Sequence, residues 1–531
     1  MIDICSYNMP CLKKTKASFR RDEKNRAVLG SAKEMMEWVK LGFEEQDARN
    51  TPDIPFQRHY IDLRNCVLYI SYPIESEDPT SKIFNLCDMA GIVPGIDNIK
   101  DDPNYLFEVK YDIYLDGSQL YGNFFHYVKF NGVVRMDNVT VHSTFSCFKC
   151  LFDGYVYMQN INITGRADFE QCEFRNGLIL NGATVDLFHF NYSTIQNQLS
   201  LASVNIVNKN YDGYHQNIEF TNSYFENINL SKCKLGPFPV YFANSEIKGM
   251  KMDNVSLDSS LVFHSCKLDG VFTIVKDDKS PNNEIDIIDL YSCDLQGQFH
   301  IENTSVKKLL FNFSKIAEFG RLRISKCNVM DLFTGSSSVY GQFDIVETKI
   351  DEVNMDETCI HGYLSFQDNN VNEYANRQTI RLLKNEAVKV NDGVAATHFY
   401  AKEMDILLKD NNIIFSEKTS LWLDKWFSGF GENWLQALLV TFGLSIVMTL
   451  LMLGCGSSKF AFNSGGEFMG VGSFVTSLLD SINVFSIPLF RDTIEEYGLN
   501  VFGQILYFLI KVIVAYGTYQ FVVSFRKYGR K

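Results

Sequence analysis

Large apolar residues return at every fifth position through the middle of the chain, with an occasional step of six and one of seven. An α-helix would spread such residues around its circumference, and a simple strand would place successive ones on opposite faces. A chain that turns a corner every five residues keeps all of them on one side. The clearest run is Phe220, Phe225, Leu230, Leu235, Phe242, Ile247, Met252, Leu257, Phe263, Leu268 and Ile274.

A small residue stands two places before many of these apolar positions. In five copies of the pattern the small residue is a cysteine: Cys172, Cys233, Cys266, Cys293 and Cys327. In other copies the same place holds Ala183, Ser193, Ser223 or Thr304. Because four residue types share the position, we interpret these cysteines as repeat-packing residues selected by size rather than by thiol chemistry.

Self-similarity at a short fixed period is typical of a solenoid, in which each coil buries its inward residues against the coils above and below. Four sides of five residues make a coil of about 20 to 22 residues, so residues 128–371 predict roughly eleven or twelve coils. Polar, turn-rich insertions at 207–217 and 275–284 break the period. We expect them to form surface loops that are candidate contact sites.

The small, any, large-apolar triplets resemble those of the pentapeptide-repeat family, although here they are mostly Cys-x-Leu, Ser-x-Ile and Thr-x-Val. The resemblance implies a right-handed quadrilateral β-helix. The C-terminal portion, with residues 420–439 and 519–531, resembles uncharacterised bacterial membrane proteins that carry such repeats. The expected fold class is therefore mainly β, a right-handed quadrilateral β-helix solenoid with a C-terminal helical hairpin and two transmembrane helices.

The two ends of the chain follow other patterns. Residues 31–50 predict an amphipathic helix that starts with a capping box at Ser31 and Glu34. Residues 59–73 and 105–117 read as strands. The expected domains are an α+β cap at 1–127, the degenerate repeat at 128–371, a helical hairpin at 372–412 from helices 372–392 and 394–411, and an amphipathic connector at 413–433.

Two further segments are long and apolar enough to cross a bilayer. Residues 434–454 carry no charge, and residues 501–523 carry only Lys511. Basic residues flank the pair, with a basic tail at 524–531, whereas the loop at 455–500 has few. With no apolar secretory segment at the start, the positive-inside rule predicts an integral membrane protein whose bulk and C-terminus are cytoplasmic. The resemblance to bacterial membrane proteins implies that this membrane is the bacterial inner membrane.

Residues 468–490 between the spans are apolar but carry a polar stripe near helical spacing. The stripe consists of Ser473, Ser477, Asp480 and Ser481. An amphipathic helix in the outer interface is the favoured interpretation, and a re-entrant pore segment is the alternative. Since a lysine at the bilayer centre normally faces a partner or water, we expect Lys511 to pair with Asp480 or to line a pore in an oligomer.

Composition and motifs limit the kinds of ligand and catalytic site that the chain is expected to have. The net charge of -13 disfavours nucleic-acid binding. Thirteen cysteines without an export signal read as reduced thiols. The one Cys-x-x-Cys, Cys147 and Cys150, is interpreted as coil packing with Phe148 and Phe152 directed inward. No P-loop, nucleophile elbow or zinc-ribbon spacing occurs, so we expect no catalytic site, metal or cofactor.

Three functions stay open on the sequence alone. The leading one is a membrane-anchored β-helix that acts as a protein-interaction or sensing platform, since solenoids offer long regular surfaces. The alternative is an oligomeric ion channel or membrane-disrupting effector gated by the β-helix, and a β-helix enzyme is the least favoured. The expected partners are membrane lipid, a protein and further copies of the chain.

Overall fold

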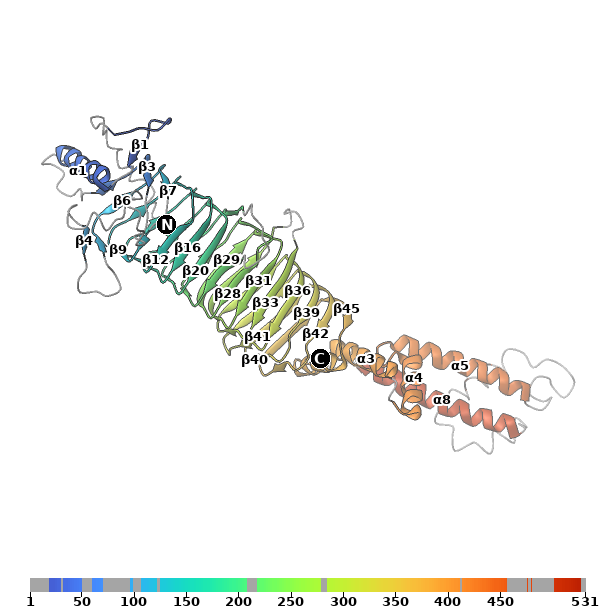
Figure 1. Cartoon of the computed structure of the whole chain (residues 1–531). Coiled ribbons are helices and arrows are strands. Elements are labelled where there is room, and N and C mark those ends of the chain that lie inside the picture. The colour runs from blue at the N-terminus through green and yellow to red at the C-terminus, as the bar shows by residue number, and fades with distance from the viewer. Residues whose placement is uncertain are drawn as a thin grey trace. The chain divides into compact units, whose positions relative to one another are not determined.

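From β5 (Phe107–Val109) to β25 (Tyr224–Phe225) each strand pairs in parallel with the strand four places later, and beyond β25 the offset falls to three or two because some strands run through a corner. One complete coil runs through β16 (Arg166–Glu170), β17 (Glu173–Phe174), β18 (Leu178–Ile179) and β19 (Thr184–Val185), and then reaches β20 (Leu187–Asn191), which lies in register on β16. Each coil therefore has four sides. The computed structural model confirms a mainly β chain with a parallel β-solenoid of about eleven turns, whose strands stack in sequence order in Figure 1.

The structure describes residues 19–29, 32–49, 60–69, 96–98, 107–121, 125–207, 217–277, 284–410, 413–455, 475, 479 and 501–526. Both predicted insertions lie largely outside these residues. The chain divides into two units, residues 1–373 and 374–531.

Three sheets form the sides of the solenoid. A nine-stranded sheet contains β1 (Ala27–Leu29), β3 (Cys66–Tyr69), β7 (Gln119–Tyr121), β11 (Thr140–Val141), β15 (Asn162–Ile163), β19, β23 (Asn205–Ile206), β27 (Lys234–Gly236) and β30 (Ser256–Leu257). A twelve-stranded sheet contains β8 (Phe125–His126), β12 (Phe145–Phe148), β16, β20, β24 (Ile218–Thr221), β28 (Val240–Ala243), β31 (Ser260–His264), β33 (Ile285–Tyr291), β36 (Ser305–Asn312), β39 (Asn328–Phe333), β42 (Lys349–Asn354) and β45 (Asn370–Tyr374). A 24-stranded sheet covers the other two sides, from β2 (Tyr60–Asp62) to β44 (Tyr363–Gln367). The ladders reach back before residue 128, into the segment expected to be a cap.

Phenylalanines stack along the core of the solenoid. Five of them, one from each successive strand of the twelve-stranded sheet, have neighbouring ring centroids 4.5 to 5.3 Å apart. These are Phe169, Phe190, Phe220, Phe242 and Phe263. Their spacing matches the separation of neighbouring strands, because each ring lies flat on the ring of the coil before it.

The small-residue position lies at a corner, directly after a residue with a positive φ. Tyr192, with φ of 54°, precedes Ser193 in this way. The hydroxyl of Ser193 donates to the carbonyl of Phe169 in the preceding coil at 3.0 Å and accepts from the amide of Cys172 at 3.1 Å. The amide of Ser193 donates in turn to the hydroxyl of Ser223 at 2.9 Å. The position therefore favours a small side chain that also forms hydrogen bonds, which is more specific than size alone.

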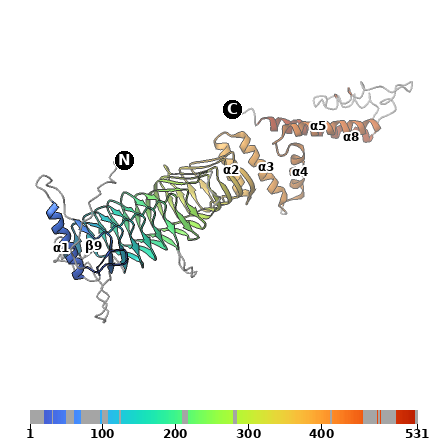
Figure 2. The same cartoon turned by 90° about the horizontal axis from the view of Figure 1, so that it is seen from above.

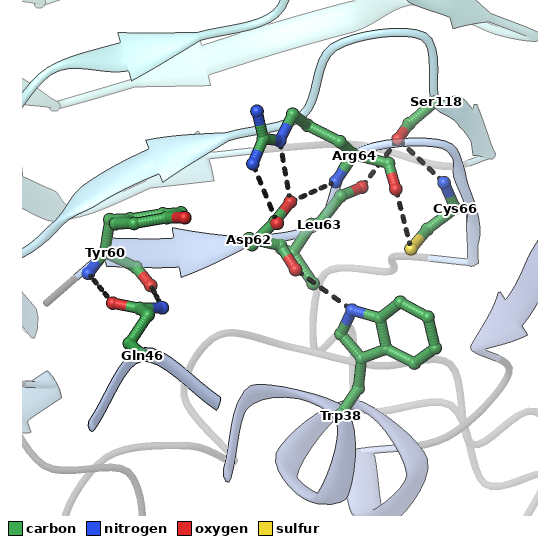
Figure 3. Close-up of polar contacts among 8 residues, drawn as sticks. All are labelled: Trp38, Gln46, Tyr60, Asp62, Leu63, Arg64, Cys66 and Ser118. Atoms are coloured by element: carbon green, nitrogen blue, oxygen red, sulfur yellow. Dashed lines mark hydrogen bonds and ion pairs between the residues drawn. The ribbon is translucent and has the colours of Figure 1, made fainter. Parts of the chain in front are cut away.

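The first helix, α1 (Ala32–Arg49), forms side-chain hydrogen bonds to β2, the first strand of the 24-stranded sheet. The side-chain amide of Gln46 donates to the carbonyl of Tyr60 at 2.8 Å and accepts from its amide at 2.9 Å. The indole of Trp38 donates to the carbonyl of Asp62 at 2.9 Å. Figure 3 shows these contacts beside the Asp62–Arg64 ion pair. Among the described residues no strand pairs with this edge of β2, and Gln46 supplies hydrogen bonds of the kind that such a strand would form.

Replacing Gln46 with Leu is expected to lower the free energy of unfolding by about 1 to 3 kcal/mol, because two buried backbone groups lose their partner. Chemical denaturation of the full chain measures the change. Gln46→Glu is the matched control, because glutamate keeps the hydrogen-bond acceptor and loses the donor. Its free energy of unfolding should lie between those of the Leu variant and the parent protein. Equal stability of all three proteins would contradict a role for Gln46 at this edge.

The second unit is helical and contains α2 (Arg377–Lys389), α3 (Gly393–Lys409), α4 (Phe415–Ser428), α5 (Trp434–Cys455) and α8 (Val501–Arg526). The two predicted hairpin helices and the two apolar segments are therefore helices. Glu403 on α3 is buried and accepts from Arg381 at 2.6 Å and from Lys384 at 2.5 Å, both on α2. This cluster of charges holds the helical hairpin together.

Helices α5 and α8 lie side by side in Figures 1 and 2. Both are long and apolar enough to cross a membrane. Trp434 at the start of α5 contacts Phe525 near the end of α8, with ring centroids 5.9 Å apart, so the two helices run antiparallel. Most of their large apolar side chains point away from the pair and are exposed.

Candidate functional sites

A pocket of about 360 Å³ opens on the outer face of the twelve-stranded sheet, near its N-terminal end. Strands β8, β12, β16 and β20 supply its walls, because alternate residues of a strand point outward from the core. The lining residues are His126, Ser146, Phe148, Arg166, Asp168, Phe169, Glu170, His189 and Asn191. Imidazole, carboxylate, guanidinium, hydroxyl and amide groups therefore share one small surface.

Asp168 and His189 form the centre of the pocket. They are direct partners in the register of β16 and β20, and Nδ1 of His189 lies 3.2 Å from Oδ1 of Asp168. Nε2 of His189 is buried and forms no hydrogen bond in the structure, whereas Oδ1 of Asp168 is buried with the His189 contact but without a well-aligned hydrogen bond. Buried polar atoms normally have a partner, so this pair retains hydrogen-bonding capacity that a ligand could use.

The order of groups across the coils argues against a serine nucleophile. Ser146 is the register partner of Asp168, which is in turn the partner of His189. The carboxylate thus lies between the hydroxyl and the imidazole, whereas a catalytic triad needs the imidazole in the middle. The arrangement is suited to binding rather than to activating Ser146.

The charges of the pocket nearly balance. Arg166 places its Nε 3.8 Å from Oδ2 of Asp168 at the open rim, where Glu170 is also exposed. Within the described residues no group of three or more His, Cys, Asp or Glu side chains is arranged to hold a metal ion. A ligand with both donors and acceptors, such as a peptide segment, would match these groups better than a simple ion.

Phe148 corrects one expectation from the sequence. The five-residue pattern placed it inward, but the structure buries Cys147 and Cys150 and leaves Phe148 half-buried on the pocket wall. Strand β12 pairs Cys147 with Phe169, an inward residue, and Phe148 with Glu170, an outward one. The prediction failed because within a strand the two-residue alternation decides the facing, and the five-residue step applies only across corners.

Burial lowers the pKa of His126 below its ordinary value of 6.5. The unfolded chain binds this proton near pH 6.5 and the folded chain binds it only at lower pH, so stability is lost as the pH falls below about 6.5. The melting temperature should therefore drop between about pH 7.5 and about pH 5.5.

The variant His126→Gln should reduce this drop, because an amide does not titrate. Part of the drop should remain in the variant, because burial and the nearby Arg321 and Arg323 also lower the pKa of His300. Thermal melts of both proteins at the two pH values test the assignment. An unchanged pH dependence in the variant would contradict it.

The five repeat cysteines are all buried at corners. Burial raises the pKa of Cys233 to about 12 and that of Cys327 to about 11. Burial likewise raises the pKa of Cys172, and the thiol of Cys266 together with burial raises that of Cys293. The raised pKa values make the thiols of these four cysteines poor nucleophiles at neutral pH. Their position agrees with a packing role.

A polar stripe runs along the α5 face that contacts α8. Thr441, Ser445 and Thr449 follow each other at four-residue intervals, and the hydroxyls of Ser445 and Thr449 donate to the carbonyls four residues earlier at 2.7 Å. An added Cβ at Gly517 of α8 would collide with the side chain of Thr441, so the two helices approach closely here. Small residues permit such close packing of apolar helices.

Lys511 is on α8 and is only 6% exposed within the helical unit. Its Nζ lies 5.2 Å from the centroid of the Tyr507 ring, which is a cation–π distance. The side chain is thus directed into protein rather than toward the exposed faces of the helices. The other predicted pore residues, Ser473, Ser477, Asp480 and Ser481, lie outside the described residues, so the pairing of Lys511 with Asp480 stays a prediction.

Asp168 and His189 were not singled out in the sequence. One signal could have found them: each directly precedes a stacked core phenylalanine, Phe169 and Phe190, and so stands at the central outward position of its strand. Which outward residues meet in a pocket depends on the register between coils. Comparison of the chain with protein-family models, with curated proteins and with solved structures found no match.

Proposed function

We propose that the chain is a membrane-anchored binding platform, in which the β-solenoid presents the Asp168–His189 pocket to a protein ligand. The observation that carries the proposal is the contact between Asp168 and His189 inside a pocket, where Nε2 of His189 lacks a hydrogen-bond partner and Oδ1 of Asp168 lacks a well-aligned one. Bound donors and acceptors would satisfy them.

The solenoid supports such a role because its stacked coils hold the lining side chains at fixed spacing. A preformed site loses little conformational entropy when a ligand binds. An extended peptide laid across β12, β16 and β20 would meet Ser146, Asp168 and His189 in turn. Coils of the pentapeptide-repeat type would continue this regular surface along the twelve-stranded sheet.

The anchoring part of the proposal rests on α5 and α8. Lys418 and Lys425 precede α5, and Arg526 and Lys527 end α8 or follow it. By the positive-inside rule the start of α5 and the end of α8 lie on the cytoplasmic side. The resemblance of the C-terminal portion to bacterial membrane proteins supports the bacterial inner membrane as the location. Resistance of the full chain to alkaline extraction from membranes, together with protease protection in sealed vesicles, tests the anchoring and the orientation.

Photo-crosslinking tests the binding site. A benzophenone amino acid at Phe148, on the pocket wall, should yield a protein adduct of discrete mass in membranes that contain the full chain. The double variant Asp168→Asn, His189→Gln should weaken the adduct by about tenfold, the effect of losing one charge-assisted hydrogen bond. The same probe at the exposed Tyr340 is the control and should give no such adduct. An adduct at Phe148 that the double variant leaves unchanged would overturn the assignment of the pocket.

An oligomeric channel is the second candidate, favoured by the burial of Lys511 within an apolar helix pair. A charged lysine at membrane depth costs about 2.5 to 3.5 kcal/mol, so its presence calls for a function or a partner. Conductance of the full chain in planar bilayers, which Lys511→Leu should abolish, tests this candidate. If Lys511→Leu leaves folding, oligomeric state and conductance unchanged, a role for Lys511 in a pore is excluded. Absence of conductance in the parent chain would exclude the channel itself.

A further inference from the structure

Helix α4 has two faces of different character. Leu421, Asp424, Phe427 and Ser428 are buried or half-buried, whereas Phe415, Trp422 and Trp426 are exposed by 84%, 55% and 42%. Three large aromatic side chains on the outside of one short helix form an unusual surface for a soluble protein.

The buried face fixes how α4 is turned. The ring of Phe427 meets that of Tyr516 on α8 edge-on, with centroids 4.9 Å apart. The hydroxyl of Ser428 donates to the side-chain carbonyl of Gln520 on α8 at 3.0 Å. Leu421 packs on the cluster of Ala401, Met404 and Phe430. These contacts fix the rotation of α4 about its axis, so packing determines that the aromatic side chains point outward.

The exposed face is an ordered aromatic surface. Trp422 and Trp426 are four residues apart, so they lie on the same side of the helix. Their rings are stacked, with centroids 6.1 Å apart and planes at 5°. Lys418 is exposed on the same helix. Indole rings beside a cation are the side chains that prefer the boundary between lipid headgroups and acyl chains.

This surface is continuous with the candidate membrane spans. The side chain of Gln436, in the first turn of α5, donates to the carbonyl of Trp426 at 2.9 Å. Tyr516 and Gln520, which hold α4, lie close to Phe521 of α8, whose ring contacts Trp434 at the start of α5 with centroids 6.1 Å apart. Helix α4 is thus attached to the end of the helix pair where a span begins.

We propose that the Phe415–Trp422–Trp426 face of α4 docks on the lipid surface, at the headgroup boundary of the leaflet where α5 enters. The inference rests on the proposed membrane anchoring of α5 and α8. Apolar and aromatic area buried in lipid and attraction of Lys418 to anionic headgroups drive the docking. The helix then sets the depth of the span and ties the second unit to the membrane plane.

Tryptophan fluorescence of the full chain tests the proposal, because the chain has only four tryptophans. Variants that keep only Trp422 or only Trp426, with the others replaced by Phe, are reconstituted into vesicles of phosphatidylcholine and phosphatidylglycerol. Lipids brominated either near the headgroup or near the chain end serve as quenchers. Each variant should lose roughly half of its emission to the shallow quencher and much less to the deep one.

Two matched reporters separate the docking from the anchoring. Phe442→Trp, as the sole tryptophan, reports the exposed middle of α5 and should be quenched best by the deep lipid. The variant that keeps only Trp38 reports the solenoid unit and should not be quenched. Circular dichroism of each variant confirms that it is folded.

Quenching at Phe442→Trp without quenching at Trp422 or Trp426 would overturn the docking and leave the anchoring intact. No quenching at any of the three positions would overturn both. Stronger quenching of Trp422 or Trp426 by the deep lipid than by the shallow one would also overturn the proposal, since α4 would then lie inside the hydrocarbon.

Discussion

The substitution Leu268→Asp is expected to unfold the coil that contains it. Leu268, on β32 (Lys267–Val275), is 1% exposed and lies in register between Ile247 and Leu295 of the neighbouring coils. Aspartate there removes the buried leucine and places a charge in an apolar core with no partner. The loss exceeds about 4 kcal/mol, a large share of the stability of a typical domain.

Circular dichroism and limited proteolysis of the full chain measure this effect. We expect loss of strand signal and new cleavage around residues 246–302. Two controls show whether the buried charge causes the effect. Leu268→Met should change stability by less than about 1.5 kcal/mol. Cys266→Ser should be tolerated, because Ser245 and Ser314 fill the same corner position in nearby coils. A parent-like melt for Leu268→Asp would contradict the inward placement.

The substitution Phe220→Ala is expected to destabilise the solenoid by about 3 to 5 kcal/mol. Phe220 is fully buried, and its ring stacks on Phe190 at 5.3 Å and on Phe242 at 4.5 Å. Its removal leaves a cavity that the rigid strands on both sides cannot close. Because coils contact only their neighbours, the damage should remain centred on β24 and the strands beside it.

Hydrogen exchange measured by mass spectrometry locates this damage. Protection should fall in strands β20, β24 and β28, with smaller changes in distant coils. Phe319→Ala is the matched control, since Phe319 is 89% exposed and its removal should change stability by no more than about 0.5 kcal/mol. Equal effects of the two alanine substitutions would mean that the stack contributes little.

The periodicity of the sequence predicted the solenoid because the repeat is local. Each apolar residue of the five-residue step meets its equivalent in the next coil, so a pattern within the chain is sufficient to specify the packing. The helices and apolar spans after residue 371 could also be predicted from the sequence. Their periodicity and length can be recognised without knowing which segments they pack against. The handedness and the pentapeptide character rest on the resemblance and stay predictions.

The pocket could not be predicted from the sequence in this way. Asp168 and His189 are separated along the chain by a whole coil, and only the register of β16 and β20 brings their atoms to 3.2 Å. The placement of Phe148 failed for a different, local reason: inside β12 the two-residue alternation turns it outward, and the five-residue step does not apply there. The exposed aromatic face of α4 likewise depends on which side α8 covers.

The parallel solenoid, the helical hairpin and the two apolar helices could be predicted from the amino-acid order, because each follows from a repeating spacing or from an uninterrupted apolar length. The polar groups that share a surface became visible only in the folded chain: the Asp168–His189 pair, the corner hydrogen bonds of Ser193 and the edge contact of Gln46. These contacts join segments that are distant in the chain. The repeat aligns the apolar positions of successive coils, but it does not specify which polar side chains come within hydrogen-bond distance.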